Sequence, residues 1–141
     1  MAGRLPYRTR RKYPHMVGDE RQVWNRFVVK FPGRFDTVDY DFRVGEGMPY
    51  QDDWEDNIRR MVTALTQKRI DVVGWNGDRP TIIEVKVRAG LSALGQVLGY
   101  VALFKLELPK FPLPRAMIVC ENTTADDLKI FKSQSIPVEI V

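Results

Sequence analysis

The sequence predicts a single mixed α/β domain, and three observations lead to this prediction. Segments with the two-residue alternation of strands are interspersed with segments in which apolar residues recur at helical spacing. The chain has 141 residues, the length of one ordinary domain. A composition of 44% hydrophobic and 28% charged residues excludes wholesale disorder and collagen-like repeats. We expect a basic N-terminal arm over residues 1–16, followed by one domain over residues 17–141.

The first half of that domain predicts a helix, a strand and a second helix. A helix is expected over residues 19–31, because Val23, Trp24, Phe27 and Val28 recur at helical spacing before Pro32 and Gly33 end it. Residues 37–44 alternate apolar and charged side chains, which is typical of a half-buried strand. After a loop, apolar residues again recur at helical spacing over residues 52–66, and acids at the start suit the positive end of a helix.

The second half alternates strands with helices. We expect strands at 69–75 and 81–87, a helix at 90–105, a strand at 115–120, a helix at 125–134 and a last strand at 137–141. The first two strands are joined through Asn76-Gly77, a strong local signal for a hairpin. Thr124 is suited to cap the helix that follows it.

Several features of the sequence bear on the cellular location of the protein. No window approaches 18 apolar residues, and no apolar run follows the basic N-terminus as a secretory signal would. The single cysteine, Cys120, cannot form an internal disulfide. We therefore expect a soluble chain in the cytoplasm, or one associated with a virion if the protein is viral.

The excess positive charge lies in the first residues. Five basic side chains and no acid occur within residues 1–12, namely Arg4, Arg8, Arg10, Arg11 and Lys12. The rest of the chain has 17 basic and 18 acidic residues, and is therefore nearly neutral. Such an arm suits a phosphate backbone or an acidic protein groove, and we predict that its five basic residues bind nucleic acid. The alternative is a solubilising tail.

Three charged residues lie in otherwise apolar strands. Asp71 is in the first strand of the hairpin, and Glu84 and Lys86 share one face of the second, about 6.5 Å apart along it. Unpaired burial of such charges costs several kcal/mol, so they either satisfy one another or hold a divalent metal beside a phosphate. Oxygen ligands favour Mg²⁺ or Mn²⁺, and we expect Asp71, Glu84 and the Val85 carbonyl as ligands. Lys86 would orient the attacking water or neutralise charge on the phosphate.

These residues resemble a known superfamily. The stretch "RIDVVGW…TIIEVKV" is similar to the D-x(n)-E-x-K core of the PD-(D/E)XK nucleases. Gln96 and Tyr100, in "QVLGY", match the Q-x-x-x-Y pattern of its RecB-like and Holliday-junction-resolvase-like branches. The resemblance covers residues 68–141, with Ile70 where the family's proline would stand. It implies a restriction-endonuclease-like mixed β-sheet flanked by helices, metal-dependent DNA cleavage, and roles for Gln96 and Tyr100 in supporting the site or touching DNA.

The resemblance also implies a further acid from the family's first helix. Glu20 and Glu55 both qualify by position, and Glu20 is favoured, although either can be a solvated residue at a helix start. His15, the only histidine, is expected to be a loop residue. Trp75 is the more exposed tryptophan, and either packs or stacks on a base.

Two functional hypotheses follow. The first is a metal-dependent DNA nuclease, directed by the structure or ends of its substrate, with a possible homodimer acting on two strands. The second is a structural or assembly protein of a nucleoprotein or phage particle, of the head-completion type, in which the basic arm docks into a partner. The acid–acid–lysine set favours the nuclease, and the near-neutral body favours the assembly protein.

Overall fold

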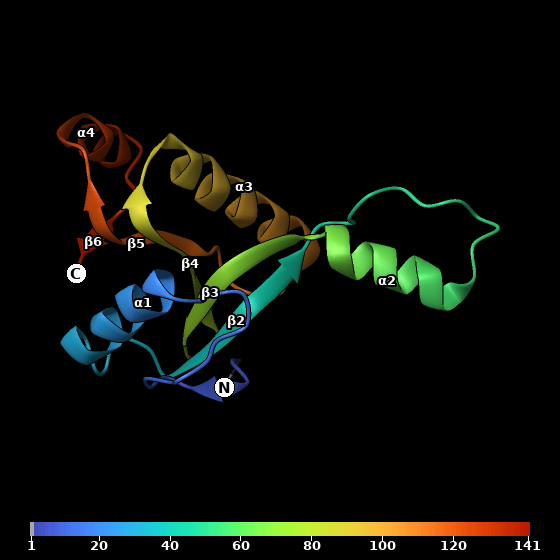
Figure 1. Ribbon diagram of the computed structural model, residues 1–141, viewed down its shortest axis with the longest axis horizontal. Coiled ribbons are helices and arrows are strands. Elements are labelled where there is room, and N and C mark those ends of the chain that lie inside the picture. The colour runs from blue at the N-terminus through green and yellow to red at the C-terminus, as the bar shows by residue number, and fades with distance from the viewer. Residues whose placement is uncertain (1) are drawn as a thin grey trace.

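One six-stranded sheet organises the protein, whose computed structural model describes residues 2–141 (Figure 1). The strands are β1 (Leu5–Pro6), β2 (Thr37–Val44), β3 (Lys68–Asn76), β4 (Arg79–Ala89), β5 (Arg115–Thr123) and β6 (Val138–Ile140). They lie in chain order across the sheet; β1 to β4 pair antiparallel, and β4 to β6 pair parallel. The sheet is therefore mixed, as the sequence predicts.

Helices cover both faces of this sheet. The helices are α1 (Asp19–Lys30), α2 (Asp56–Thr66), α3 (Leu91–Glu107) and α4 (Ala125–Ser133). Figure 1 shows α1 on one side of the sheet and α3 on the other, with α2 projecting away from it. Trp24 and Phe27 of α1 pack on one face, and Phe104 of α3 packs on the other. No helix within residues 2–141 is long and apolar enough to span a membrane.

Strand β4 supplies side chains to both cores. Ile83 and Val85 belong to the core under α1, and Ile82 belongs to the core under α3. Because side chains alternate along a strand, Glu84 and Lys86 fall on the same face as Ile82, toward α3. The apolar neighbours of Glu84 therefore fix which helix it meets.

Each predicted helix and strand is present, and β2 has the predicted bounds. The hairpin strands extend further toward each other than predicted, to Asn76 and Arg79, because Gly77 has a φ of 60° at the first central position of a two-residue turn. Helix α2 begins at Asp56, four residues later than predicted. Its apolar stripe contributes nothing to the core, since none of its side chains, all of which are described, is buried.

The basic N-terminal segment lies against the domain instead of extending as an arm, and Met1 of that segment lies outside the described residues. Strand β1 pairs with the edge of β2, and Tyr13 and Met16 are buried in the core under α1. Arg4 Nε donates to Asp39 Oδ1 at 2.8 Å. Asp39 is only 3% exposed, so this ion pair explains why a basic residue is held at the edge of the sheet.

Trp75 is buried, contrary to its prediction as the more exposed tryptophan. Its side chain is 2% exposed, and its Nε1 donates to Asp39 Oδ2 at 3.0 Å. It packs beside Phe104 and Phe111. Base stacking by Trp75 is therefore excluded, because the ring already forms part of the core.

Candidate active site

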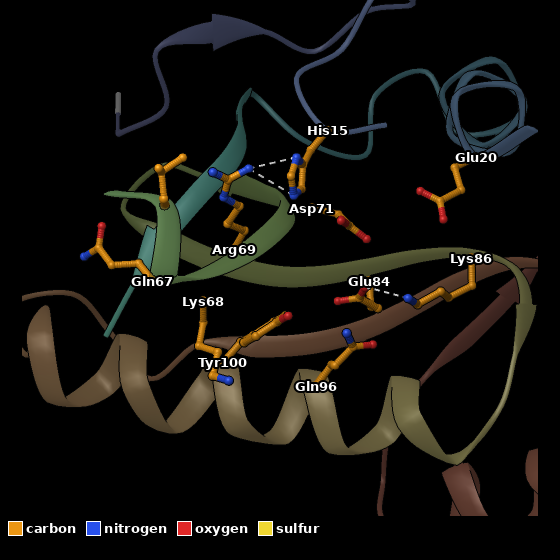
Figure 2. Close-up of a pocket in the computed structure, with 11 residues that line it drawn as sticks. His15, Glu20, Gln67, Lys68, Arg69, Asp71, Glu84, Lys86, Gln96 and Tyr100 are labelled. Atoms are coloured by element: carbon orange, nitrogen blue, oxygen red, sulfur yellow. Dashed lines mark hydrogen bonds and ion pairs between the residues drawn. The ribbon is translucent and has the colours of Figure 1, made fainter. Parts of the chain in front are cut away.

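A cleft of about 500 Å³ opens between α1 and α3, where β3 and β4 separate (Figure 2). Ten of the residues that line it are labelled in Figure 2: His15, Glu20, Gln67, Lys68, Arg69, Asp71, Glu84, Lys86, Gln96 and Tyr100. Polar and charged side chains from α1, β3, β4 and α3 thus converge on one opening. Six of the predicted site side chains are among them, from Glu20 to Tyr100.

The cleft opens because the two hairpin strands diverge at Asp71. Pairing between β3 and β4 runs from Asn76–Arg79 to Val72–Ile83 and stops there. Beyond that point β3 pairs with β2, and β4 pairs with β5. Asp71 Oδ2 accepts a hydrogen bond from the Val85 backbone N–H at 2.9 Å. The Asp71 carboxylate therefore bridges the two strands where the ladder between them ends.

Glu84 is a buried carboxylate with an unused oxygen. Its residue is 3% exposed, and its Oε1 lies 3.5 Å from Lys86 Nζ. Its Oε2 is buried and has no hydrogen-bond partner among residues 2–141. Burial, and then the nearby Asp71 carboxylate, raise the pKa of Glu84 well above its ordinary value, while Lys86 opposes the shift. An extra cation at this point would relieve both effects.

Two side chains of α3 face the same point. Gln96 and Tyr100 are four residues apart, so both lie on one side of the helix, and Figure 2 shows them directed toward Glu84. Burial, and then the Glu84 and Asp71 carboxylates, raise the pKa of Tyr100 to about 12. Tyr100 therefore keeps its proton at neutral pH. Gln96 Oε1 is buried and makes no hydrogen bond within the described part of the chain.

Glu20 faces the cleft from α1, on the side opposite α3 (Figure 2). Burial, and then the Asp71 carboxylate, raise the pKa of Glu20. Glu55, the other candidate for a further acid, is exposed at the start of α2, and the described cleft lining does not include it. Of these two acids, the structure brings Glu20 to the cleft.

Two basic residues of the cleft rim, Lys68 and Arg69, escaped the sequence analysis. Arg69 Nη1 lies 2.9 Å from His15 Nδ1, and Arg69 Nε lies 3.8 Å from Asp41 Oδ1. His15 is therefore a residue of the cleft rim, and not only a loop residue as expected. A signal for Arg69 was present, because it precedes Asp71 by two positions and so shares its face of β3.

The donor set fits a divalent ion that keeps several of its own waters. Within residues 2–141, no three His, Cys, Asp or Glu side chains gather closely enough to hold a metal by themselves. Mg²⁺ commonly binds through only one or two carboxylates, with water completing the shell. Two carboxylates, Asp71 of β3 and Glu84 of β4, match that requirement, and the Val85 carbonyl follows Glu84 on β4. Glu84 Oε2, which has no hydrogen-bond partner among residues 2–141, is likewise free to bind such an ion.

The predicted nucleic-acid-binding residues do not lie together. Arg4 forms an ion pair with Asp39, and it is not among the described residues that line the cleft. Arg8 and Lys12 are exposed. Arg10 and Arg11 line a separate hollow beside the start of α1. The structure thus divides the five basic residues between a structural contact and a surface that faces solvent.

No protein-family model and no curated protein sequence matches the chain. Two solved structures have a similar fold. One is a repair endonuclease from Pyrococcus abyssi, with 15% sequence identity and a TM-score of 0.50 over 91% of this chain and 49% of that chain. The other is EndoMS in an EndoMS–dsDNA2 complex, with 13% identity and a TM-score of 0.51 over 94% of this chain and 48% of that chain. This chain therefore spans about half the length of each.

At these identities the similarity shows the fold. The restriction-endonuclease-like α/β fold, a mixed sheet flanked by helices, is confirmed. The fold is thus shared with a repair endonuclease and with EndoMS, whereas the activity of this chain has to be argued from its own residues.

Proposed function

We propose that this protein is a metal-dependent nuclease of the PD-(D/E)XK type that hydrolyses phosphodiester bonds in DNA. The observation that carries the proposal is the Glu84 carboxylate, which is buried, faces an open cleft with Asp71 and Lys86, and has an oxygen without a partner in residues 2–141. A buried charge of this kind is costly unless a cation pairs with it. The D-x(n)-E-x-K pattern implies that the cation is Mg²⁺ or Mn²⁺.

The ligands would be Asp71, Glu84 and the Val85 carbonyl. When bound there, a divalent ion polarises a phosphoryl oxygen and lowers the pKa of water. Lys86 reaches the same point from β4, with its Nζ 3.5 Å from Glu84 Oε1. Its ammonium group would offset negative charge that develops on the phosphate oxygens, or orient the attacking water.

We also assign roles to side chains from α1 and α3, the two helices that flank the cleft. Tyr100, with its pKa raised to about 12, keeps its hydroxyl proton at neutral pH and can donate it in a hydrogen bond. Gln96 offers a buried amide oxygen that can hold a water. Glu20 is suited to accept a proton from that water, because its raised pKa brings it closer to neutrality.

DNA is the substrate favoured by two independent considerations. The chain shares its fold with a repair endonuclease and with EndoMS, which was solved in a complex with dsDNA. Lys68 and Arg69 also line the cleft, and Arg10 and Arg11 of the N-terminal segment line a separate hollow. We further propose that the protein selects the structure or ends of DNA rather than its sequence.

The test is cleavage of labelled linear, nicked and branched DNA in Mg²⁺, Mn²⁺ or EDTA. Asp71→Asn and Lys86→Ala should both abolish metal-dependent cutting. Lys129→Ala, which removes an exposed lysine of α4 outside the described cleft lining, is the matched control and should cut like the parent. Thermal unfolding with added Mg²⁺ reports metal binding separately, because a ligand of the folded state raises the unfolding temperature.

The outcomes separate the two hypotheses. Metal-dependent cutting that is lost in both site variants and retained in the control supports the nuclease. If the parent binds Mg²⁺ but cuts none of the DNAs, the nuclease proposal is wrong and the assembly protein is favoured. If it neither binds metal nor cuts, Asp71, Glu84 and Lys86 form only a salt-bridged hairpin.

A further inference from the structure

A second hollow lies beside the first half of α1. It has a volume of about 520 Å³, and its lining residues are Thr9, Arg10, Arg11, Arg21, Gln22 and Asn25, which we call the arginine pocket. Glu20 lines the cleft and Arg21 lines the arginine pocket. The two are consecutive on α1, about 100° apart around the helix. The cleft and the arginine pocket are therefore neighbours.

The arginine pocket is strongly basic. Three of its residues are arginines, and no acidic residue lines it in the described chain. None of these arginines belongs to an ion pair within residues 2–141, although six other basic residues do. Clustered guanidinium groups without a carboxylate nearby repel one another, and an anion bound between them removes that repulsion.

The pocket is also held in place by hydrogen bonds. Asn25 Nδ2 donates to the Arg10 carbonyl at 3.1 Å, and the Arg10 N–H donates to the Tyr13 hydroxyl at 2.8 Å. Arg21 Nη1 donates to the Arg11 carbonyl at 2.8 Å, which leaves its other N–H groups for a ligand. Because the backbone of residues 9–13 is fixed to α1, little conformational entropy is lost when a ligand binds.

We infer that the arginine pocket binds phosphates of a DNA strand next to the phosphate held in the cleft. This inference rests on the proposed function and extends it, because it assigns Arg21 to DNA binding and defines the substrate as a strand that continues past the cut bond. Arginine matches phosphate geometry with paired N–H donors. Phosphates repeat along a DNA strand, so a strand with one phosphate in the cleft carries others to the neighbouring hollow.

The experiment measures DNA binding in EDTA, where no cleavage takes place. A short fluorescein-labelled duplex is titrated with the parent, Arg21→Gln and Arg26→Gln at several KCl concentrations, and binding is read as anisotropy. Arg26 is the matched control, since it is on the same helix but is paired with Glu121 at 3.2 Å. Arg21→Gln should weaken binding about threefold to tenfold and reduce the slope of log K against log salt by about one. Arg26→Gln should leave that slope unchanged.

A charge-retaining variant guards against a purely structural effect. Arg21→Lys should keep the parental salt slope, because a lysine still releases a counterion from the phosphate. The triple variant of Arg10, Arg11 and Arg21 to glutamine should reduce the slope by about three. Circular dichroism of every variant checks that it folds, and a loss of slope in an unfolded variant is excluded from the comparison.

Three results would overturn the inference. Equal effects of Arg21→Gln and Arg26→Gln would mean that only net charge matters. A parental slope in the triple variant would place the phosphate contacts elsewhere. Displacement of DNA by inorganic phosphate beyond the effect of KCl at equal ionic strength would assign the pocket to a free anion. If DNA binding depends on Arg21 but no cleavage occurs in Mg²⁺, the proposed nuclease function fails and this inference stands.

Discussion

Replacing Glu84 with glutamine should make the metal-free protein more stable. Glutamine keeps the size of the side chain and removes its charge from a site where the residue is 3% exposed. It also removes the repulsion between Glu84 and Asp71. It gives up one ion pair, at 3.5 Å to Lys86, whose side chain is 28% exposed and can be solvated by water instead.

The size of the effect follows from the proton that the folded protein must hold on Glu84 and that glutamine does not need. Holding that proton above the unfolded pKa costs about 1.4 kcal/mol per pH unit, and part of this cost remains because glutamine still leaves a polar atom where Glu84 Oε2 lies. We therefore expect Glu84→Gln to raise the free energy of unfolding by about 1–3 kcal/mol at pH 8, which for a chain of this length is a rise in Tm of roughly 3–9 °C. Because the variant also loses the ion pair with Lys86, we expect the gain in unfolding free energy to lie toward the lower end of that range.

The gain in unfolding free energy from Glu84→Gln should depend on pH. The folded pKa of Glu84 lies above its ordinary value of 4.5, so the folded protein holds a proton that the unfolded chain releases. Stability from this group is thus retained below about pH 4.5 and is lost as the pH rises toward the folded pKa. At pH 5 the parent has lost little of the stability that depends on Glu84, so Glu84→Gln should change Tm only slightly.

Thermal unfolding by circular dichroism in EDTA at pH 5 and pH 8 measures both effects. Glu121→Gln, which breaks an exposed ion pair with Arg26, is the control and should change stability by less than about 1 kcal/mol. Added Mg²⁺ should raise the Tm of the parent and not that of Glu84→Gln. A lower Tm of Glu84→Gln at pH 8, or the same gain at both pH values, would refute the reasoning.

Three further outcomes are expected. Glu20→Gln should slow Mg²⁺-dependent DNA cleavage by roughly 10²-fold, as removal of a general base does, while Glu55→Gln should keep the parental initial rate; equal rates would remove Glu20 from the site. Trp75→Leu should cost about 2–4 kcal/mol in urea unfolding, because it leaves a cavity and deprives a buried carboxylate of a donor, and a loss below about 1 kcal/mol would contradict this. Gly74→Ala would place a Cβ 2.7 Å from the ring of Phe35 and should cost about 1–3 kcal/mol; an unchanged urea midpoint would show that the ring moves aside freely.

Local patterns predicted the part of the cleft that lies on the hairpin and on α3. Asp71, Glu84 and Lys86 interrupt apolar strands, and the alternation of side chains puts Glu84 and Lys86 on one face without any knowledge of the rest of the fold. Gln96 and Tyr100 share a helix face for the same kind of reason. These side chains could be placed together because one short turn connects the strands that carry three of them.

Contacts between distant segments decided what the sequence analysis missed. Strand β1 forms because Asp39, buried 35 positions later than Arg4, needs a cation, and a charged stretch gives no sign of that partner. Trp75 is buried because its indole meets the same carboxylate. The apolar spacing in α2 indicated a helix correctly but could not show whether another element covers it. His15 meets Arg69 across 54 positions.

The walls of the cleft differ in how firmly they are held. Strand β4, which carries Glu84 and Lys86, is paired with β3 as far as Ile83 and with β5 from Thr81 to Ala89, so its amides should be among the slowest to exchange with deuterium. Helix α2, whose last turn brings Leu65 to the cleft, has no buried side chain along its fully described length, and its amides should exchange fastest among the helices. Local opening would therefore widen the cleft by moving α2 while the acidic residues keep their positions. A bulky substrate can enter in this way without disturbing the sheet.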